Sequence, residues 1–195
     1  MTQTLIKMPA IWRPLTQQAI FRSVLTAMSF PGRIMDIGEL LEGARTELGV
    51  LASLADDMVT IADPCFRLTE DDRRMLCAGS APASEADYIL FEGAMAPPEN
   101  LTPRLGTIYR PESAALLALT DVNLDEGDTH LKLTGPGIQT AKELSLSGLH
   151  PAWLEVRKRW NANFPTGVDF IFCDATRIVA IPRTTVIEKA DKWDM

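Results

Sequence analysis

The sequence contains few histidines and few cysteines, and its net charge is negative. Each of these properties argues against a class of function. Among 195 residues there are 2 His and 3 Cys, and Asp plus Glu outnumber Lys plus Arg by 26 to 19. His130 and His150 lie far apart and outside any metal-ligand spacing, so we expect no metal site. The net charge of -7 disfavours general attraction to nucleic acid or to an anionic membrane surface.

Long apolar runs and sorting signals are also lacking. Nowhere do about 18 apolar residues follow one another, which is the length that a membrane-spanning helix needs. Met1–Ile11 has no basic region followed by an apolar stretch. The number of cysteines is odd, and Cys65, Cys77 and Cys173 form no C-x-x-C pair. Their apolar sequence neighbours indicate packed positions. We therefore expect a cytoplasmic protein with reduced cysteines and no cysteine nucleophile.

The composition that remains is that of an ordinary folded protein, with 46% apolar and 23% charged residues. The length suits a single domain over residues 1–195, and the sequence has no internal repeat. No G-x-S-x-G turn, G-x-G-x-x-G fingerprint or Gly-Lys-Ser/Thr loop is present, so the residues alone support no catalytic site.

Apolar periodicity and capping residues predict several helices. A proline-terminated stretch predicts a helix over Thr16–Met28 with Thr16 as its N-cap. Its expected apolar stripe consists of Ile20, Phe21, Val24, Leu25 and Met28. A short buried helix is expected over Leu48–Ala55, and Thr69–Asp72 has the pattern of a capped helix start, with Gly79 at the end.

A further helix is predicted over His150–Asn161. Trp153, Val156 and Trp160 follow helical spacing and predict an aromatic, packed face. The basic run Arg157–Arg159 is expected on the opposite, solvated face, because adjacent helical cations spread around the helix.

Short apolar runs between the helices predict strands. They are Arg33–Ile37, Met58–Ala62, Tyr88–Phe91, Ala115–Leu119, Leu131–Leu133, Val168–Cys173 and Arg177–Ile181. The last two are separated by Asp174–Thr176, which predicts a hairpin. Alternating helices and strands indicate an α/β or α+β fold with a mixed sheet and flanking helices.

Two glycines follow one of the predicted strands, in Leu133–Ile138. Backbone N–H groups around Gly135 and Gly137 could face an anion. However, Pro136 removes a donor and the third glycine of a nucleotide-binding loop is missing. We therefore favour a tight turn that ends the strand over a phosphate loop.

A second candidate binding segment is Arg183 with Thr184 and Thr185, directly after an apolar strand. A guanidinium beside two hydroxyls suits an oxyanion. Alternatively, Arg183 pairs with Asp169, because an acid on an apolar strand needs a cationic or hydrogen-bonded partner. The sequence leaves both interpretations open.

Four motifs together resemble the PhnH family, the H subunit of the bacterial carbon-phosphorus lyase system. They are Phe21–Met28 leading into Pro31–Ile34, then Leu133–Ile138, Phe164–Asp169 and Ala180–Thr185. The motifs occur in the family's order and extend over most of the chain.

The resemblance implies a layered α/β fold similar to the large domain of pyridoxal-phosphate-dependent transferases, without that cofactor's chemistry. It also implies a homodimer that joins the G, I and J subunits in a core complex for phosphonate use. That complex forms ribose 1-phosphonate 5-triphosphate when a phosphonate displaces adenine from ATP. The resemblance carries over no catalytic residue, so we expect a dimerising and docking subunit.

No lysine has the sequence context that a pyridoxal Schiff base requires, and we therefore expect no cofactor. An alternative function is the binding of an anionic ligand, a nucleotide or a phosphonate intermediate. The residues proposed for it are Arg183, Thr184, Thr185, Gly135 and Gly137.

Overall fold

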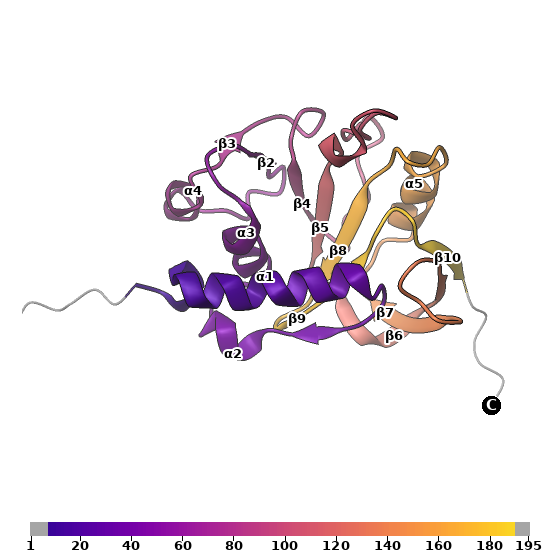
Figure 1. The fold of residues 1–195 in the computed structure, drawn as a ribbon, viewed down its shortest axis with the longest axis horizontal. Coiled ribbons are helices and arrows are strands. Elements are labelled where there is room, and N and C mark those ends of the chain that lie inside the picture. Colours follow the sequence, from indigo (N-terminus) through magenta and orange to yellow (C-terminus); the bar gives the residue numbers. More distant parts are fainter. Residues whose placement is uncertain (1–7, 190–195) are drawn as a thin grey trace, which may run out of the picture.

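The computed structural model describes residues 8–189 and contains two β-sheets with helices around them (Figure 1). The larger sheet consists of β1 (Met35–Asp36), β2 (Thr60–Ala62), β3 (Gly79–Ser80), β4 (Tyr88–Glu92), β5 (Leu116–Thr120), β8 (Asp169–Cys173) and β9 (Arg177–Ile181). Its strand order is β1-β9-β8-β5-β4-β2-β3. Strands β3, β2, β4, β5 and β8 run parallel to one another, whereas β9 is antiparallel to both of its neighbours.

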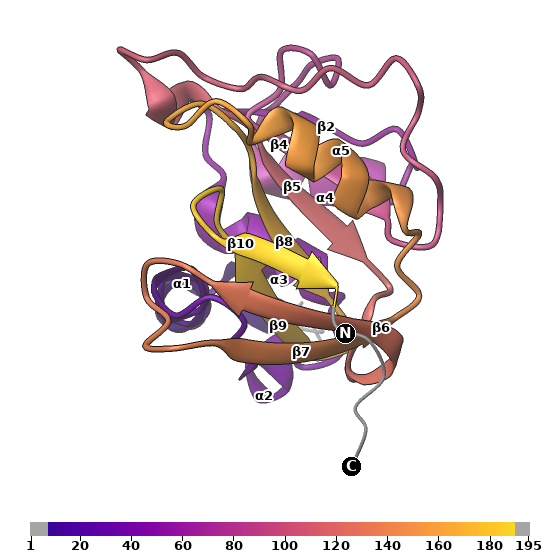
Figure 2. The same cartoon turned by 90° about the vertical axis from the view of Figure 1, so that its right-hand side faces the viewer.

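Helices pack around this sheet. They are α1 (Pro14–Ser29), α2 (Gly38–Leu41), α3 (Thr46–Leu54), α4 (Glu70–Leu76) and α5 (Ala152–Trp160), with 3-10 turns η1 (Ala10–Trp12) and η2 (Pro111–Ser113). The smaller sheet consists of β6 (Asn123–Thr134), β7 (Lys142–Ser147) and β10 (Val186–Lys189), in the antiparallel order β10-β6-β7. Figure 2 shows β10 and α5 on the same side of the large sheet.

Different elements cover the two faces of the large sheet, because side chains alternate along each strand. In β4, Leu90 packs with the buried residues of α1 and α3. Its neighbours Ile89 and Phe91 belong to the opposite cluster, together with Trp153 of α5 and Leu131 of the small sheet. One apolar cluster therefore joins the large sheet, the small sheet and α5.

The expected α/β class, a layered mixed sheet with flanking helices, is confirmed. The predicted hairpin is also confirmed, since β8 and β9 pair antiparallel. The likeness to the large domain of pyridoxal-phosphate-dependent transferases and the single domain over 1–195 stay predictions.

The predicted start of the first helix is wrong, and its predicted apolar stripe is buried only in part, at Ile20 and Val24. Helix α1 begins at Pro14, whose missing N–H is harmless in a first turn, so Thr16 is not its cap. Phe21 and Leu25 are 44% and 54% exposed. The buried residues of α1 are Ile20, Val24 and Ala27.

The capped start of α4 is confirmed, but its predicted end is wrong. The Thr69 hydroxyl accepts a hydrogen bond from the backbone N–H of Asp72, and the Asp72 carboxylate accepts one from the N–H of Thr69. The helix ends at Leu76, its C-cap residue Cys77 has the left-handed φ of 57°, and Gly79 instead begins β3. Cys77 is therefore exposed, contrary to its expected packing.

The smaller sheet is largely missed by sequence patterns. Strand β6 is much longer than the predicted Leu131–Leu133, and β7 and β10 were not predicted. Exposed charged side chains occur at many positions of these strands, so only short apolar runs remain in the sequence to indicate a strand.

Candidate functional site

Arg183 lies after β9 and pairs with Asp169 at the start of β8. Its Nη2 lies 2.5 Å from Oδ2 of the carboxylate, and its Nε donates to both carboxylate oxygens at 3.2 Å. Its Nη1 donates to the carbonyl oxygen of Pro111 at 2.8 Å. The guanidinium thus has protein acceptors for each of its nitrogens, and it ties the loop before β5 to the sheet.

The glycine turn lies beside the segment that contains Arg183. Strand β10 pairs with β6 so that Val186 is opposite Thr134, which brings Gly135 against Thr184. A Cβ atom at Gly135 would lie 2.8 Å from the Thr184 carbonyl oxygen, and one at Gly137 would collide with the Ser29 carbonyl oxygen. Close backbone approach and φ values of 133° and 83° explain both glycines as parts of a tight turn.

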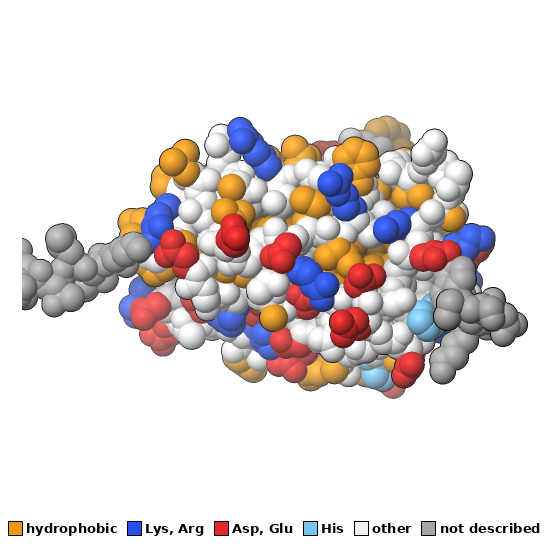
Figure 3. All heavy atoms as spheres, turned by 90° about the horizontal axis from the view of Figure 1, so that it is seen from below, with side chains coloured by type: hydrophobic (Ala, Val, Ile, Leu, Met, Phe, Trp, Pro, Cys, Tyr) orange, Lys and Arg blue, Asp and Glu red, His pale blue; other side chains and the backbone are white. Residues whose placement is uncertain are grey.

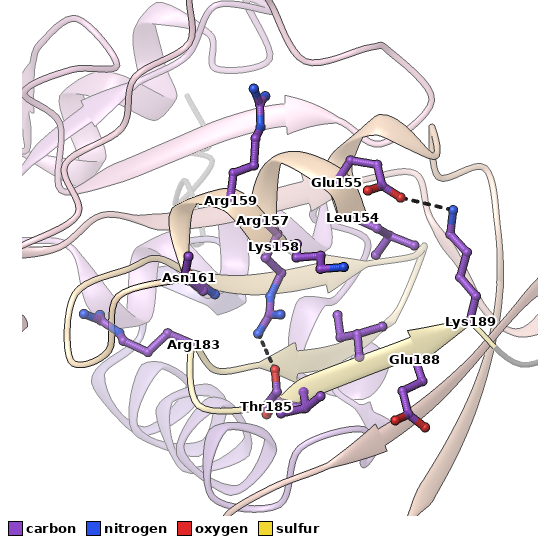
Figure 4. A pocket seen from close by; sticks show the side chains of 13 residues that line it. Leu154, Glu155, Arg157, Lys158, Arg159, Asn161, Arg183, Thr185, Glu188 and Lys189 are labelled. Atoms are coloured by element: carbon purple, nitrogen blue, oxygen red, sulfur yellow. Dashed lines mark hydrogen bonds and ion pairs between the residues drawn. The ribbon is translucent and has the colours of Figure 1, made fainter.

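A groove of about 810 Å³ lies between α5 and β10, here called the α5–β10 groove (Figure 4). Its lining residues are Leu154, Glu155, Arg157, Lys158, Arg159, Asn161, Ala162, Arg183, Thr185, Val186, Ile187, Glu188 and Lys189. The predicted site residues Arg183 and Thr185 therefore border this groove. In Figure 4, however, the Arg183 guanidinium points away from it.

Arg157 crosses from α5 to the β9–β10 turn and is buried, so its predicted place on a solvated face is wrong. Its Nη2 donates to the carbonyl oxygens of Pro182 and Thr185, at 2.6 and 3.1 Å. Its guanidinium carbon lies 5.9 Å from the ring centroid of Phe170. Burial lowers the pKa of Arg157 to about 10, although nearby Asp169 acts in the opposite direction.

A signal for this burial exists in the sequence. Arg157 lies four residues after Trp153 and three before Trp160, which places it on the helical stripe that was predicted to be packed. Lys158 and Arg159 lie off this stripe and are exposed, as expected.

A second polar cluster, which sequence analysis missed, centres on Arg67, on the chain segment after β2. Its Nη2 donates to Oε1 of Glu47 at 2.9 Å, and its Nη1 donates to Oδ2 of Asp121 at 2.6 Å. Burial opposes its charge, but the hydrogen bond and the charge of Glu47, followed by Asp121, raise its pKa. All of these groups are paired with one another, so the cluster connects α3 to the large sheet and has a structural role.

The other sequence candidates have local structural roles. The Nδ1 atom of His150 accepts a hydrogen bond from the backbone N–H of Ala152 at 3.3 Å, in the turn that leads into α5. His130 lies in β6, with its Nδ1 3.0 Å from the Ser145 hydroxyl oxygen. Within residues 8–189 no group of three or more His, Cys, Asp or Glu side chains could hold a metal ion.

The face of the molecule drawn in Figure 3 carries charges of both signs, and acidic and basic side chains are interspersed over it. Over the described range, no helix combines the length and the apolar character that crossing a membrane requires.

These features define a two-sheet α/β protein with a basic groove beside its smaller sheet. The family model "Bacterial phosphonate metabolism protein (PhnH)" matches residues 10–188 of the chain. The chain therefore belongs to the PhnH family, which confirms the resemblance drawn from its motifs.

Two named relatives are similar to the chain. "Putative C-P lyase subunit protein HtxG" of Stutzerimonas stutzeri is 40% identical over 177 residues, which cover 91% of this chain and 88% of that protein. "Alpha-D-ribose 1-methylphosphonate 5-triphosphate synthase subunit PhnH" of Rhizobium meliloti (strain 1021) is 30% identical over 105 residues. That second match covers 54% of this chain and 52% of the relative.

Proposed function

We propose that this chain is a subunit of a carbon-phosphorus lyase complex. Within it, the chain would serve the formation of ribose 1-phosphonate 5-triphosphate, in which a phosphonate displaces adenine from ATP. The family match over residues 10–188 carries this proposal. The names of the two relatives, a C-P lyase subunit and a subunit of a ribose methylphosphonate triphosphate synthase, support it.

The proposed role is that of a cytoplasmic homodimer that docks the G, I and J subunits. Exposed apolar side chains on two neighbouring loops support a docking role, because a grouped apolar surface favours protein contact. Arg183 joins these loops by donating to the carbonyl oxygens of Pro111 and Pro165. The exposed side chains are Ile108, Tyr109 and Phe164, at 73%, 94% and 71% exposure.

Co-expression with the G, I and J subunits tests this role. Co-purification reports assembly, and phosphonate-dependent release of adenine reports activity. We expect a Tyr109→Ser, Phe164→Ser double variant to lose assembly while keeping its fold. Met58→Ser is the matched control, because Met58 is 83% exposed on another part of the surface. If the unaltered chain does not assemble with the three subunits, the proposal is wrong.

A second candidate function is the binding of an anionic ligand by Arg183, Thr184, Thr185 and the Gly135–Gly137 turn. The approach of Gly135 to the Thr184 carbonyl oxygen supports a shared location for these residues. Because Asp169 already neutralises Arg183, this candidate requires the ligand to displace the carboxylate or to bind beside it. If the Arg183→Ala variant still assembles into the complex but the complex releases no adenine, this candidate is favoured. If the variant no longer assembles, a structural role of Arg183 is favoured.

A further inference from the structure

Positive charge in the α5–β10 groove exceeds what its acidic residues neutralise. Glu155 pairs with Lys189 at 3.4 Å, and Glu188 pairs with Lys132 at 3.6 Å. Among the residues that the structure describes, none forms an ion pair with Arg157–Arg159. The groove therefore has a surplus of positive charge along its helical wall.

Two buried polar atoms at this groove lack a hydrogen-bond partner. They are Nε of Arg157 and Oγ1 of Thr185, which come from opposite walls. Arg157 is 4% exposed and Thr185 is 2% exposed, and both residues line the inner surface of the groove. Buried guanidinium groups normally have an anionic partner, and buried hydroxyls are normally hydrogen-bonded. An acceptor placed at the inner surface of the groove would satisfy both atoms.

The guanidinium is held in one orientation before any ligand arrives. Its Nη2 donates to two carbonyl oxygens, and its central carbon lies over the Phe170 ring, 5.9 Å from the centroid. Figure 4 shows Lys158 extending into the same space, whereas Arg159 points away from it. A fixed donor beside a mobile ammonium group is a common arrangement for binding phosphoryl oxygens.

We propose that the α5–β10 groove binds a phosphate or phosphonate group of an organic molecule. Arg157 Nε and Lys158 Nζ would donate to its oxygens, and the Thr185 hydroxyl would complete the contact. A single oxyanion would leave much of the 810 Å³ empty. The apolar part of the lining would take the organic remainder; it consists of Leu154, Ala162, Val186 and Ile187.

This inference shares Thr185 and its ligand class with the second candidate function, but it takes its other donors from Arg157 and Lys158 and does not depend on assembly of the complex. The isolated full-length chain is sufficient to test it. A failure to bind ligand would leave assembly with the G, I and J subunits unaffected, so the two proposals can fail separately.

Calorimetric titration of the isolated chain with methylphosphonate, inorganic triphosphate and acetate tests the site. Lys158→Ala removes an exposed donor and should not affect folding. Thr185→Val removes a hydroxyl that has no protein partner and keeps the β-branched shape. We expect each change to weaken binding of the phosphorus oxyanions roughly tenfold, which corresponds to the loss of one charge-assisted hydrogen bond. Arg159→Ala, the matched control, should leave binding unchanged.

Comparison of the probes identifies the source of the ligand. Tighter binding of triphosphate indicates a nucleotide-like ligand, and tighter binding of methylphosphonate indicates a phosphonate. Acetate should bind at least tenfold more weakly than either, because it carries one negative charge. The proposal is overturned if no phosphorus oxyanion binds at millimolar concentration, or if Arg159→Ala weakens binding as much as Lys158→Ala.

Discussion

The Arg183 guanidinium and the Asp169 carboxylate connect the end of β9 to the start of β8. Besides the side-chain ion pair of 2.5 Å, the backbone N–H of Arg183 donates to Oδ1 of Asp169 at 2.6 Å. The two side chains are only 14% and 16% exposed. This pair fixes the turn from which the chain leaves the large sheet and enters β10.

Replacing Asp169 by Asn should destabilise the protein strongly. The change leaves a mostly buried guanidinium without its counter-charge, and breaking such a pair costs roughly 3 kcal/mol. The free energy of unfolding in urea measures this loss. Glu112→Gln is the control, because Glu112 pairs with Arg110 at 3.5 Å on the exposed surface. An equal effect of both substitutions would contradict the structural role of Asp169.

Thr69→Ala should lower the free energy of unfolding by about 1 kcal/mol, the usual effect of losing an N-cap side chain. The Thr69 hydroxyl accepts from the N–H of Asp72, and alanine leaves that donor without its acceptor. Urea denaturation measures the change. Thr26→Ala is the matched control: the Thr26 hydroxyl donates to the Arg22 carbonyl oxygen inside α1, where alanine is well tolerated. A Thr26 effect as large as that of Thr69 would rule out the capping explanation.

The buried thiol of Cys173 should make the protein less stable in alkaline solution. Burial, followed by the charges of Glu47 and Asp174, raises the pKa of Cys173 well above 9.0. Above pH 9 the unfolded chain therefore releases this proton more readily than the folded one, and stability falls as pH rises. Unfolding free energies between pH 8 and about pH 10 should decline less steeply in Cys173→Ala. The exposed Cys77→Ala is the control, and equal slopes in both variants would refute the effect.

The single-domain prediction leads us to expect one cooperative unfolding transition. Trp153 of α5 packs with residues of both sheets, so its surroundings change when either sheet unfolds. Tryptophan fluorescence and far-ultraviolet circular dichroism should therefore give coincident urea curves. Two separate transitions would show that the sheets unfold independently.

Much of the large sheet could be predicted from the sequence because its strands are nearly continuous apolar runs. Ile89–Phe91 and Phe170–Cys173 are buried on both faces, which gives a strong signal over few residues. The contact between Arg183 and Asp169 was also suggested by the sequence, since an acid among apolar strand residues needs a partner.

The groove could not be predicted in the same way, because it depends on contacts between distant segments. Ile187 of β10 is opposite Leu133 of β6, a pairing that no local pattern reveals. From the sequence alone, Arg157 belongs to a basic run for which only a solvated position is expected. Its burial follows from the tertiary position of Pro182 and Thr185, whose carbonyl oxygens bind it.

Strand β10 lies at the edge of its sheet, with β6 as its neighbour there. An edge strand is held on one side only, so it opens more easily than a central strand. One wall of the groove can therefore separate without disturbing the large sheet. A ligand that bridges Arg157 and Thr185 would hold this wall in place, so amide hydrogen exchange in β10 would slow as the groove fills with ligand.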